Sequence, residues 1–416
     1  MKIALCILGL LNSIFVLGQE NGGRFITDHK SGCNVWDAYY SPEDSISWAG
    51  SCKDKMANGT GTLIWFDHGK EVARYEGIMQ RGNPNGIGKY QFAGGGKMEG
   101  NFVDGVLLNL EEVYLKKLKK HKISGVDSTG IFANNGGEKE LFYYALVPEG
   151  PIKGVLVLLP SSGERPEEVF SNNVILTERA CDNNLLTIIP SVNSHVCFDT
   201  PVRNFLNAVF SDAILRYKIP KDKFILGGLS LGGMFSLRYT EMAYAQKERN
   251  AIVPKAVYGV DPPLDLANLY GQFERDVERN FSPPAVQEAK YYLEGMNKMF
   301  GGTPKSNPDK YILNSIYSRD QKDGGNAKHL INVPVRIYSD PDIDWQLKNK
   351  HRDYYDMNAP DQTAMINQLI LSGNTRAEFI NALGKGYRLD GSRHPHSWSI
   401  VEPGEFIIWA KKCIQE

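Results

Sequence analysis

The sequence predicts an α/β fold with a mainly parallel sheet, preceded by a small all-β domain. From about residue 138 onward, short apolar runs alternate with segments of helical periodicity. Such alternation is typical of a parallel sheet covered by helices on both faces. Residues 32–105 are instead rich in glycine and aromatic residues and poor in helix signals. A chain of 416 residues has room for two or three domains of this kind.

The composition excludes several classes of protein. Lysine and arginine number 47 against 48 aspartate and glutamate residues, so the excess positive charge expected of a nucleic-acid-binding protein is absent. The 42% hydrophobic content is ordinary for a globular protein with a large core. We therefore expect a globular protein with no nucleic-acid partner.

The first 18 residues resemble a targeting segment rather than part of the folded domain. Met1-Lys2 precedes an apolar run that ends at the small residue Gly18. A helix of about 15 residues spans only ~22 Å, which is too short for a ~30 Å hydrocarbon core. Residues 1–18 are thus predicted to be a cleavable signal peptide, with an uncleaved anchor as the alternative. The mature protein, starting near Gln19, is expected to be secreted or periplasmic, in the cell envelope.

Export permits disulfide bonds among the cysteines that follow the leader. Cys33 and Cys52 lie in the same small domain and form the favoured pair. A Cys181–Cys197 pair is the weaker alternative, because both could be buried thiols. No pair has the CxxC spacing of a structural zinc site, and no metal is expected.

Residues 19–109 contain a repeat of about 25 residues, each copy holding one hairpin. An aromatic-x-Gly motif occurs at Trp48-Ala49-Gly50 and Tyr75-Glu76-Gly77, and Met98-Glu99-Gly100 begins a third copy. The first two copies continue with Asn58-Gly59-Thr60-Gly61 and Asn85-Gly86-Ile87-Gly88. Asn-Gly is a strong hairpin signal because a type I′ turn needs positive φ at both central residues. Hairpin turns are therefore predicted at Asn58-Gly59 and Asn85-Gly86, within a short β-solenoid or meander.

These motifs resemble MORN repeats, whose core reads Tyr-x-Gly followed by Asn-Gly-x-Gly. The resemblance implies a structural module, or one that docks to a protein or envelope surface. A connector is predicted over residues 110–137. Its basic run, residues 116–122, is interpreted as a solvated strand or helix face, with contact to an anionic surface as the alternative.

From residue 138 to the C-terminus the elements follow one another in α/β order. Helical periodicity covers residues 202–217 and 233–246, and a closing helix is predicted over 406–414. Predicted strands, each a short apolar run of the kind buried on both faces, are residues 141–147, 155–159, 185–189, 224–227, 257–260, 335–338 and 378–383.

The strand at 224–227 leads into Gly228-Leu229-Ser230-Leu231-Gly232 and then a helix. This is the G-x-S-x-G pattern in the strand–turn–helix context that its mechanism requires. The tight turn needs neighbours without a Cβ, and it raises the serine above a helix N-terminus that favours developing negative charge. Ser230 is the predicted nucleophile.

A serine hydroxyl needs a base at neutral pH, and the base needs an acid to hold it. His396 lies after the last predicted strand and before the closing helix, so it is the predicted base, with His394 as the alternative. Three aspartates follow the strand at 335–338. Asp342 is the favoured acid and the alternatives, in order, are Asp340, Asp344 and, after the preceding strand, Asp261.

An oxyanion hole requires two backbone N–H groups. Leu231, directly after the nucleophile, is expected to supply one of them. The loop after residues 155–159 reads Pro160-Ser161-Ser162-Gly163-Glu164, and its small residues let the backbone approach a carbonyl oxygen. Ser162 is the predicted second donor, and Gly163 is the alternative.

Together these residues give residues 138–416 a resemblance to the α/β-hydrolase superfamily. The resemblance implies an eight-stranded, mostly parallel sheet and no cofactor. About 75 residues separate the strands at 257–260 and 335–338, far more than a direct connection needs, so residues 264–330 are interpreted as a helical cap. Its aromatic residues line a pocket or, as the simpler interpretation, form the cap's own core.

The predicted function is hydrolysis of carboxylic esters, on a small molecule or a polymer, through an acyl-enzyme. A serine peptidase is the enzymatic alternative, because the same groups cleave amides. A catalytically idle binding protein that keeps the fold as a scaffold is the alternative from another class.

Overall fold

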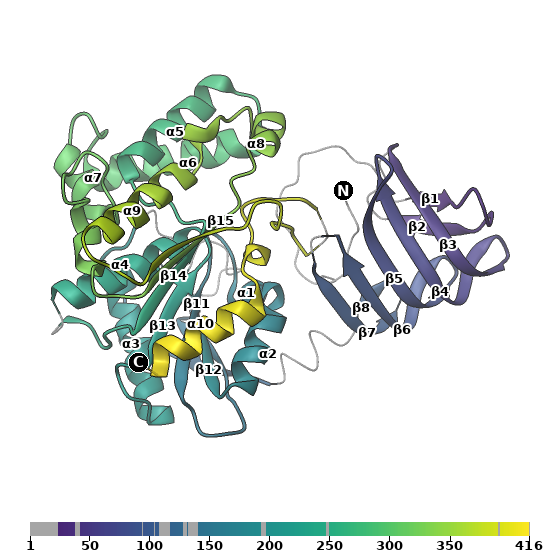
Figure 1. Ribbon diagram of the computed structural model, residues 1–416, viewed down its shortest axis with the longest axis horizontal. Coiled ribbons are helices and arrows are strands. Elements are labelled where there is room, and N and C mark those ends of the chain that lie inside the picture. The colour runs from purple at the N-terminus through teal and green to yellow at the C-terminus, as the bar shows by residue number, and fades with distance from the viewer. Residues whose placement is uncertain are drawn as a thin grey trace. The chain divides into compact units, whose positions relative to one another are not determined.

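The computed structural model describes residues 24–37, 42–93, 95–103, 105–107, 117–127, 131, 140–192, 197–246, 249–389 and 392–415. The predicted signal peptide lies outside these ranges. The chain divides into two compact units (Figure 1). The N-terminal unit holds Met1–Lys117 with Lys385–His394, and the C-terminal unit holds Leu118–Gly384 with Pro395–Glu416.

The N-terminal unit is one eight-stranded sheet in the order β1-β2-β4-β5-β6-β7-β8, with β3 paired to β4. From β3 to β8 each strand pairs antiparallel with the next along the chain. The meander predicted for this part of the chain is thereby confirmed. Its strands are β1 (Arg24–Thr27), β2 (Asn34–Asp37), β3 (Asp44–Lys53), β4 (Met56–Asp67), β5 (Lys70–Gln80), β6 (Asn83–Phe92), β7 (Lys97–Val103) and β8 (Val106–Leu107).

The predicted hairpin turns at Asn58-Gly59 and Asn85-Gly86 are wrong, because both pairs lie inside strands, in β4 and β6. The chain reverses instead at three pairs that have positive φ at both residues, as a type I′ turn requires. These pairs are Asp54-Lys55, His68-Gly69 and Arg81-Gly82.

The glycines of the repeat make room for an aromatic ring. Gly50 lies opposite Gly61 in the β3–β4 ladder, and a Cβ on Gly61 would come within 2.4 Å of the Trp48 ring. Gly77 and Gly88 pair in the same way, and a Cβ on Gly88 would approach the Tyr75 hydroxyl to 2.2 Å. The aromatic-x-Gly repeat therefore has a packing cause: a buried ring lies flat over a pair of facing glycines.

Cys33 and Cys52 form a disulfide, as predicted, with their Cα atoms 5.7 Å apart. The bond joins the residue before β2 to the far end of β3. The alternative Cys181–Cys197 pair is not formed. Cys197 is buried and its sulfur lies 2.9 Å from the sulfur of Met299.

Removing this disulfide with Cys33→Ala and Cys52→Ala is expected to lower the free energy of unfolding of the N-terminal unit by about 3 kcal/mol. The bond closes a loop with a sequence separation of 19 residues, and a loop of that size gives a stabilisation of this order in the chain-entropy model. The free energy of unfolding is measured from amide hydrogen exchange in residues 44–67 at increasing urea concentration. Dithiothreitol should reproduce the shift in the wild type and add nothing in the double variant. Equal stability of wild type and double variant would contradict the prediction.

The C-terminal unit holds the second eight-stranded sheet, in the order β16-β15-β14-β13-β11-β12-β10-β9. Its strands pair in parallel except that β10 runs antiparallel to both β12 and β9. The predicted eight-stranded, mostly parallel sheet is confirmed. Its strands are β9 (Leu118–Lys122), β10 (Phe142–Leu146), β11 (Gly154–Leu159), β12 (Leu185–Pro190), β13 (Phe224–Gly228), β14 (Ala256–Val260), β15 (Val335–Ser339) and β16 (Ala377–Asn381).

The edge strand β9 lies inside the stretch predicted as a connector. Its basic run is a solvated strand face, since Lys119, Lys120 and Lys122 are exposed. Lys120 and Lys122 both contact the Glu140 carboxylate. Those two lysines lower the pKa of Glu140 below its ordinary value.

Helices cover both faces of this sheet. On one face α3 (Thr200–Tyr217) and α4 (Leu231–Ala245) pack on the strands, with Phe210 against Phe224. On the other face lie α1 (Pro166–Asn172), α2 (Val174–Asp182) and α10 (Pro403–Gln415), with Phe406 against Tyr258. Sheet strands such as β11 and β13 are buried on both sides, which explains their continuous apolar sequences.

The insertion between β14 and β15 is helical, as predicted. It consists of α5 (Leu266–Arg279), α6 (Pro283–Phe300), α7 (Pro308–Asn314) and the 3₁₀ helix η3 (Gly325–Leu330). Of its aromatic and methionine residues, Tyr270, Phe273, Tyr292, Met296 and Phe300 are buried, and Phe273 stacks on Tyr292 at 5.2 Å. This favours the interpretation that most of them form the core of the insertion itself.

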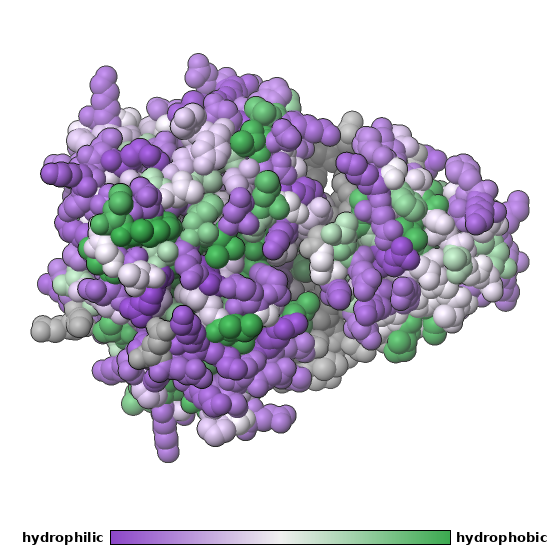
Figure 2. Space-filling view, viewed as in Figure 1, coloured by the Kyte–Doolittle hydropathy of each residue, from purple (hydrophilic) through white to green (hydrophobic). Residues whose placement is uncertain are grey.

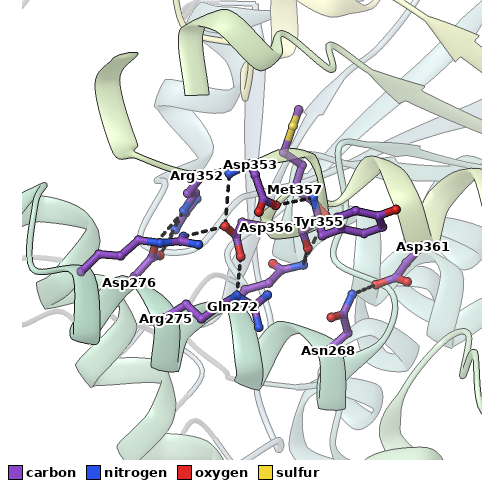
Figure 3. Close-up of polar contacts among 11 residues, drawn as sticks. Asn268, Gln272, Arg275, Asp276, Arg352, Asp353, Tyr355, Asp356, Met357 and Asp361 are labelled. Carbon is purple, nitrogen blue, oxygen red and sulfur yellow. Dashed lines mark hydrogen bonds and ion pairs between the residues drawn. The ribbon is translucent and has the colours of Figure 1, made fainter. Parts of the chain in front are cut away.

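Figure 3 shows the polar contacts that hold α5 against the segment following β15. Arg275 and Arg279 each contact the buried Asp356 carboxylate at 2.5 Å, and Arg352 pairs with the buried Asp276. Burial acts to raise the pKa of Asp356, but the two arginines outweigh it, so the pKa lies below its ordinary value. Because removing one partner would leave a buried charge, these pairs fix the position of α5.

On the face of the molecule in view, apolar side chains lie in separate patches among polar ones (Figure 2). Within the described ranges, no helix combines the length and the apolar character that crossing a bilayer requires.

Candidate active site

Ser230 lies at the sharp turn between β13 and α4. Its backbone has φ 54° and ψ −115°, a strained conformation for a residue with a side chain, which costs on the order of 1–3 kcal/mol. The Ser230 N–H donates to the carbonyl of Val260, 2.8 Å away at the end of β14. The turn therefore sits at the carboxyl edge of the sheet, beside the next strand.

Two glycines of the motif are required by space. A Cβ on Gly232 would lie 2.1 Å from the carbonyl oxygen of Leu159, and one on Gly228 would lie 2.5 Å from the same atom. Real Cβ atoms do not approach backbone this closely, so the turn can pack against the end of β11 only with glycine at both positions. This is the physical reason for the G-x-S-x-G spacing found in the sequence.

His396 contacts the carboxylate of Asp261, with 2.7 Å between Nδ1 and Oδ2. Asp261 is the residue directly after β14, so it follows Val260, the acceptor of the Ser230 N–H. The backbone of Ser230 and the Asp261–His396 pair therefore both lie at the end of β14.

The aspartate that contacts His396 is Asp261, not Asp342, which the sequence favoured as the acid. Asp342 is the N-cap of α8 (Ile343–Lys350), and its carboxylate accepts the N–H of Trp345 at 3.0 Å. Asp340 is buried and accepts the N–H of Gly384 at 3.0 Å. Asp344 is exposed in the first turn of α8. Helix capping explains why acidic residues gather after β15.

The alternative base, His394, lies in the Lys385–His394 segment, which groups with the N-terminal unit. Its N–H donates to the carbonyl of Gly386 at 3.0 Å. His396 follows it by two residues and belongs to the C-terminal unit.

Residues that the sequence did not single out hold Asp261 in place. The buried Gln362 of α9 (Ala359–Leu371) donates to Asp261 Oδ1 at 2.9 Å, so the two carboxylate oxygens have different partners. Asn358, the N-cap of α9, donates to the Asp261 carbonyl at 3.0 Å. The positive φ of Asp261, 46°, marks it as a special backbone position, but φ is not readable from sequence.

The two residues predicted as oxyanion donors, Leu231 and Ser162, lie at the start of α4 and in the loop after β11. Leu231 is the first residue of α4, so its N–H has no carbonyl partner within the helix. Ser162 is exposed in the loop that follows β11, where Gly163 has φ 72°. Burial raises the pKa of Tyr292, and the nearby Ser162 side chain acts in the opposite direction. Helix α6 of the insertion therefore reaches the predicted oxyanion loop.

Among the described residues, no cluster of three or more His, Cys, Asp or Glu side chains is arranged to hold a metal ion.

The sequence matches no protein-family model and no curated protein. Among solved structures, it is similar to an acylaminoacyl peptidase from Pyrococcus horikoshii, with a TM-score of 0.46 and 13% identity over 90% of this chain and 62% of that one. It is also similar to carboxyl esterase 2 from Tuber melanosporum, with a TM-score of 0.44 and 14% identity over 72% of this chain and 87% of that one. An S-formylglutathione hydrolase from Agrobacterium tumefaciens is similar with a TM-score of 0.41 and 10% identity, over 71% of this chain and 95% of that one. These likenesses are too distant to decide an activity, for which the residues of the site are the only basis.

Proposed function

We propose that this protein is a serine hydrolase of the α/β-hydrolase type that cleaves carboxylic esters through an acyl-enzyme. The observation that carries the proposal is the strained backbone of Ser230. The Ser230 N–H donates to Val260, and the next residue, Asp261, contacts His396. Strain at a single non-glycine residue persists only where the surroundings enforce it, and it clusters at functional sites.

In the first half of the reaction, Ser230 Oγ attacks the ester carbonyl carbon while His396 Nε2 takes the hydroxyl proton. Asp261 accepts the Nδ1–H of His396, which fixes the tautomer and stabilises the imidazolium. The carbonyl oxygen becomes an oxyanion, for which we propose the N–H groups of Leu231 and of Ser162, or its neighbour Gly163, as donors. The imidazolium then protonates the leaving alcohol, and the acyl group stays on Ser230.

In the second half, water replaces the alcohol. His396 removes a proton from the water as its oxygen attacks the acyl carbon. The tetrahedral intermediate then breaks its bond to Ser230 Oγ, which takes the proton back from the His396 imidazolium as the acid is released. Every step uses side chains and N–H groups of this chain.

The proposal is tested by labelling the mature protein with a fluorophosphonate probe. Wild type should label, and Ser230→Ala and His396→Ala should not, because the first lacks the nucleophile and the second its base. Loss of turnover of about 10⁶-fold is expected for Ser230→Ala on p-nitrophenyl esters. Circular dichroism confirms that each variant is folded. Folded wild type that neither labels nor turns over an ester or a peptide anilide would refute the proposal and favour an idle scaffold, while turnover of anilides alone would make the protein a peptidase.

We also propose that the protein is exported, from the predicted signal peptide at residues 1–18 and the disulfide between Cys33 and Cys52. N-terminal sequencing of protein recovered outside the cytoplasm should begin near Gln19. A chain that keeps Met1 and stays in the cytoplasm would contradict it.

A further inference from the structure

The site contains an acidic residue that the mechanism leaves unused. Glu164, at the end of the loop that follows β11, accepts hydrogen bonds from three different segments. The Ser161 N–H donates to its Oε2 at 2.9 Å. Asn172 of α1 and the indole N–H of Trp398 both donate to its Oε1, at 3.1 Å and 2.9 Å.

The positions of these donors matter more than their number. Ser161 is adjacent to Ser162, the proposed oxyanion donor. Trp398 is two residues beyond His396 and is itself buried. One carboxylate therefore bonds directly to the backbone of the oxyanion loop and to the side chain that anchors the histidine segment, while Asn172 ties it to α1.

Glu164 is kept at some cost in stability. Burial raises its pKa from 4.5 to about 7, although Ser161, Trp398 and Asn172 lower it and the nearby Glu168 of α1 raises it further. Because this pKa is higher in the folded state than in the unfolded chain, the group favours folding below about pH 4.5. That contribution is lost as the pH rises through about 7. Three donors therefore hold this carboxyl group in place although burial disfavours its charged form.

We propose that Glu164 is a positioning residue that fixes the position of the oxyanion loop relative to the His396 segment. The inference rests on the proposed ester hydrolysis. Its chemical basis is acceptor capacity: a carboxylate presents two acceptor oxygens to three donors, whereas an amide in the same place keeps one oxygen and turns an N–H₂ group toward another donor.

The test compares Glu164→Gln, Trp398→Phe and the double variant in steady-state hydrolysis of a p-nitrophenyl ester. Each single change should lower kcat by about 10- to 100-fold with KM within about 2-fold. The oxyanion is present only in the transition state, and outright loss of an oxyanion donor costs 10²–10³-fold. The double variant should be no slower than the slower single variant, because both changes break one linkage.

Glu168→Gln is the matched control. It removes a carboxylate on α1 that also accepts a backbone N–H, that of Arg165 at 2.7 Å. Its kcat should stay within about 2-fold of wild type. Hydrogen exchange by mass spectrometry adds a readout that needs no turnover: Glu164→Gln should exchange faster both in residues 160–164 and in residues 396–400.

The outcomes separate the two proposals. If wild type and Glu164→Gln hydrolyse the ester with equal kcat, or if the effects of the two single changes multiply, Glu164 is not the link and the inference is overturned while ester hydrolysis stands. If exchange rises in only one of the two segments, the inference is likewise overturned. If folded wild type shows no labelling by fluorophosphonate and no turnover, the proposed function fails, and the positioning role fails with it.

Discussion

Replacing Asp261 by asparagine is expected to lower kcat by about 10⁴-fold, the loss that follows when the acid of a Ser-His-Asp triad becomes an amide. Asparagine can still accept the N–H of Gln362 through its oxygen, which leaves its N–H₂ group facing His396 Nδ1. The histidine must then carry its proton on Nε2, where it can no longer accept the proton of Ser230. Ester turnover and the rate of fluorophosphonate labelling both measure the effect.

Asp342→Asn is the matched control, since it makes the same chemical change at the acid favoured from sequence. Asparagine caps a helix about as well as aspartate, so α8 should persist and kcat should stay within about 2-fold of wild type. The opposite result, a loss of activity in Asp342→Asn with Asp261→Asn unaffected, would restore Asp342 as the triad acid and refute the role given to Asp261.

Gly232→Ala is the second change for which a large effect is expected. The new methyl group would lie 2.1 Å from the carbonyl oxygen of Leu159 and 2.6 Å from that of Pro160. Backbone at the end of β11 must shift, and it carries the oxyanion loop with it. A displacement of about 1 Å at a catalytic group costs about 10²-fold in rate, and overpacking costs about 1–3 kcal/mol. We expect kcat to fall at least about 100-fold and the thermal midpoint to fall by several degrees.

Gly271→Ala separates this steric effect from the general effect of replacing a helical glycine. Gly271 lies in α5, and a Cβ there meets one atom, Nη1 of Arg275, at 3.3 Å; this atom can move by a few tenths of an ångström while Nε stays hydrogen-bonded to Asp356. Alanine favours a helix by about 0.8–1.0 kcal/mol over glycine, so this variant should be slightly stabilised and fully active. Wild-type kcat in Gly232→Ala would show that the loop tolerates the methyl group and that the turn is looser than the structure indicates.

The sequence was most informative where a segment's own pattern decides its structure. The strands β11 to β15 were predicted within about two residues at either end, because a strand buried on both faces must be almost wholly apolar. The Ser230 turn was predicted for a similar reason: a serine between glycines, after a strand and before a helix, is a local signature. Neither conclusion required knowledge of how distant segments meet.

The aspartate that contacts His396 could not be identified in this way, because the contact depends on which strand end the His396 segment meets in the folded chain. The interaction of His396 with Asp261 spans 135 residues, and β14 and β15 both end beside an aspartate. The cluster Asp340, Asp342 and Asp344 drew the prediction toward β15. One sequence signal points to a different role for Asp342: it lies directly before a helical segment, where aspartate commonly serves as the N-cap. In the structure it accepts the N–H of Trp345, three residues on.

The hairpin turns of the N-terminal unit were mispredicted for a different reason. The glycines that follow asparagine, Gly59 and Gly86, do have a positive φ, 77° and 100°. Each lies where the register of its antiparallel ladder shifts, as at a β-bulge, rather than at a chain reversal. The residues that do turn, such as Asp54-Lys55, include a lysine with φ 61°, which local preference alone would not select. A positive φ is required both at a type I′ turn and at a bulge, so an Asn-Gly pair alone does not distinguish the two.

The position of Asp261 bears on how far the helical insertion can vary in length. The insertion leaves the sheet just after this residue and returns at β15, the strand hydrogen-bonded to β14. Its two ends are thus neighbours, so lengthening it adds only about 0.6 kcal/mol of loop entropy per doubling. Gln362 and Asn358, which hold the acid, lie beyond its return point. The segment between can therefore change in length without separating β14 from β15, provided that its contacts with Ser162 and with residues 355–361 are kept.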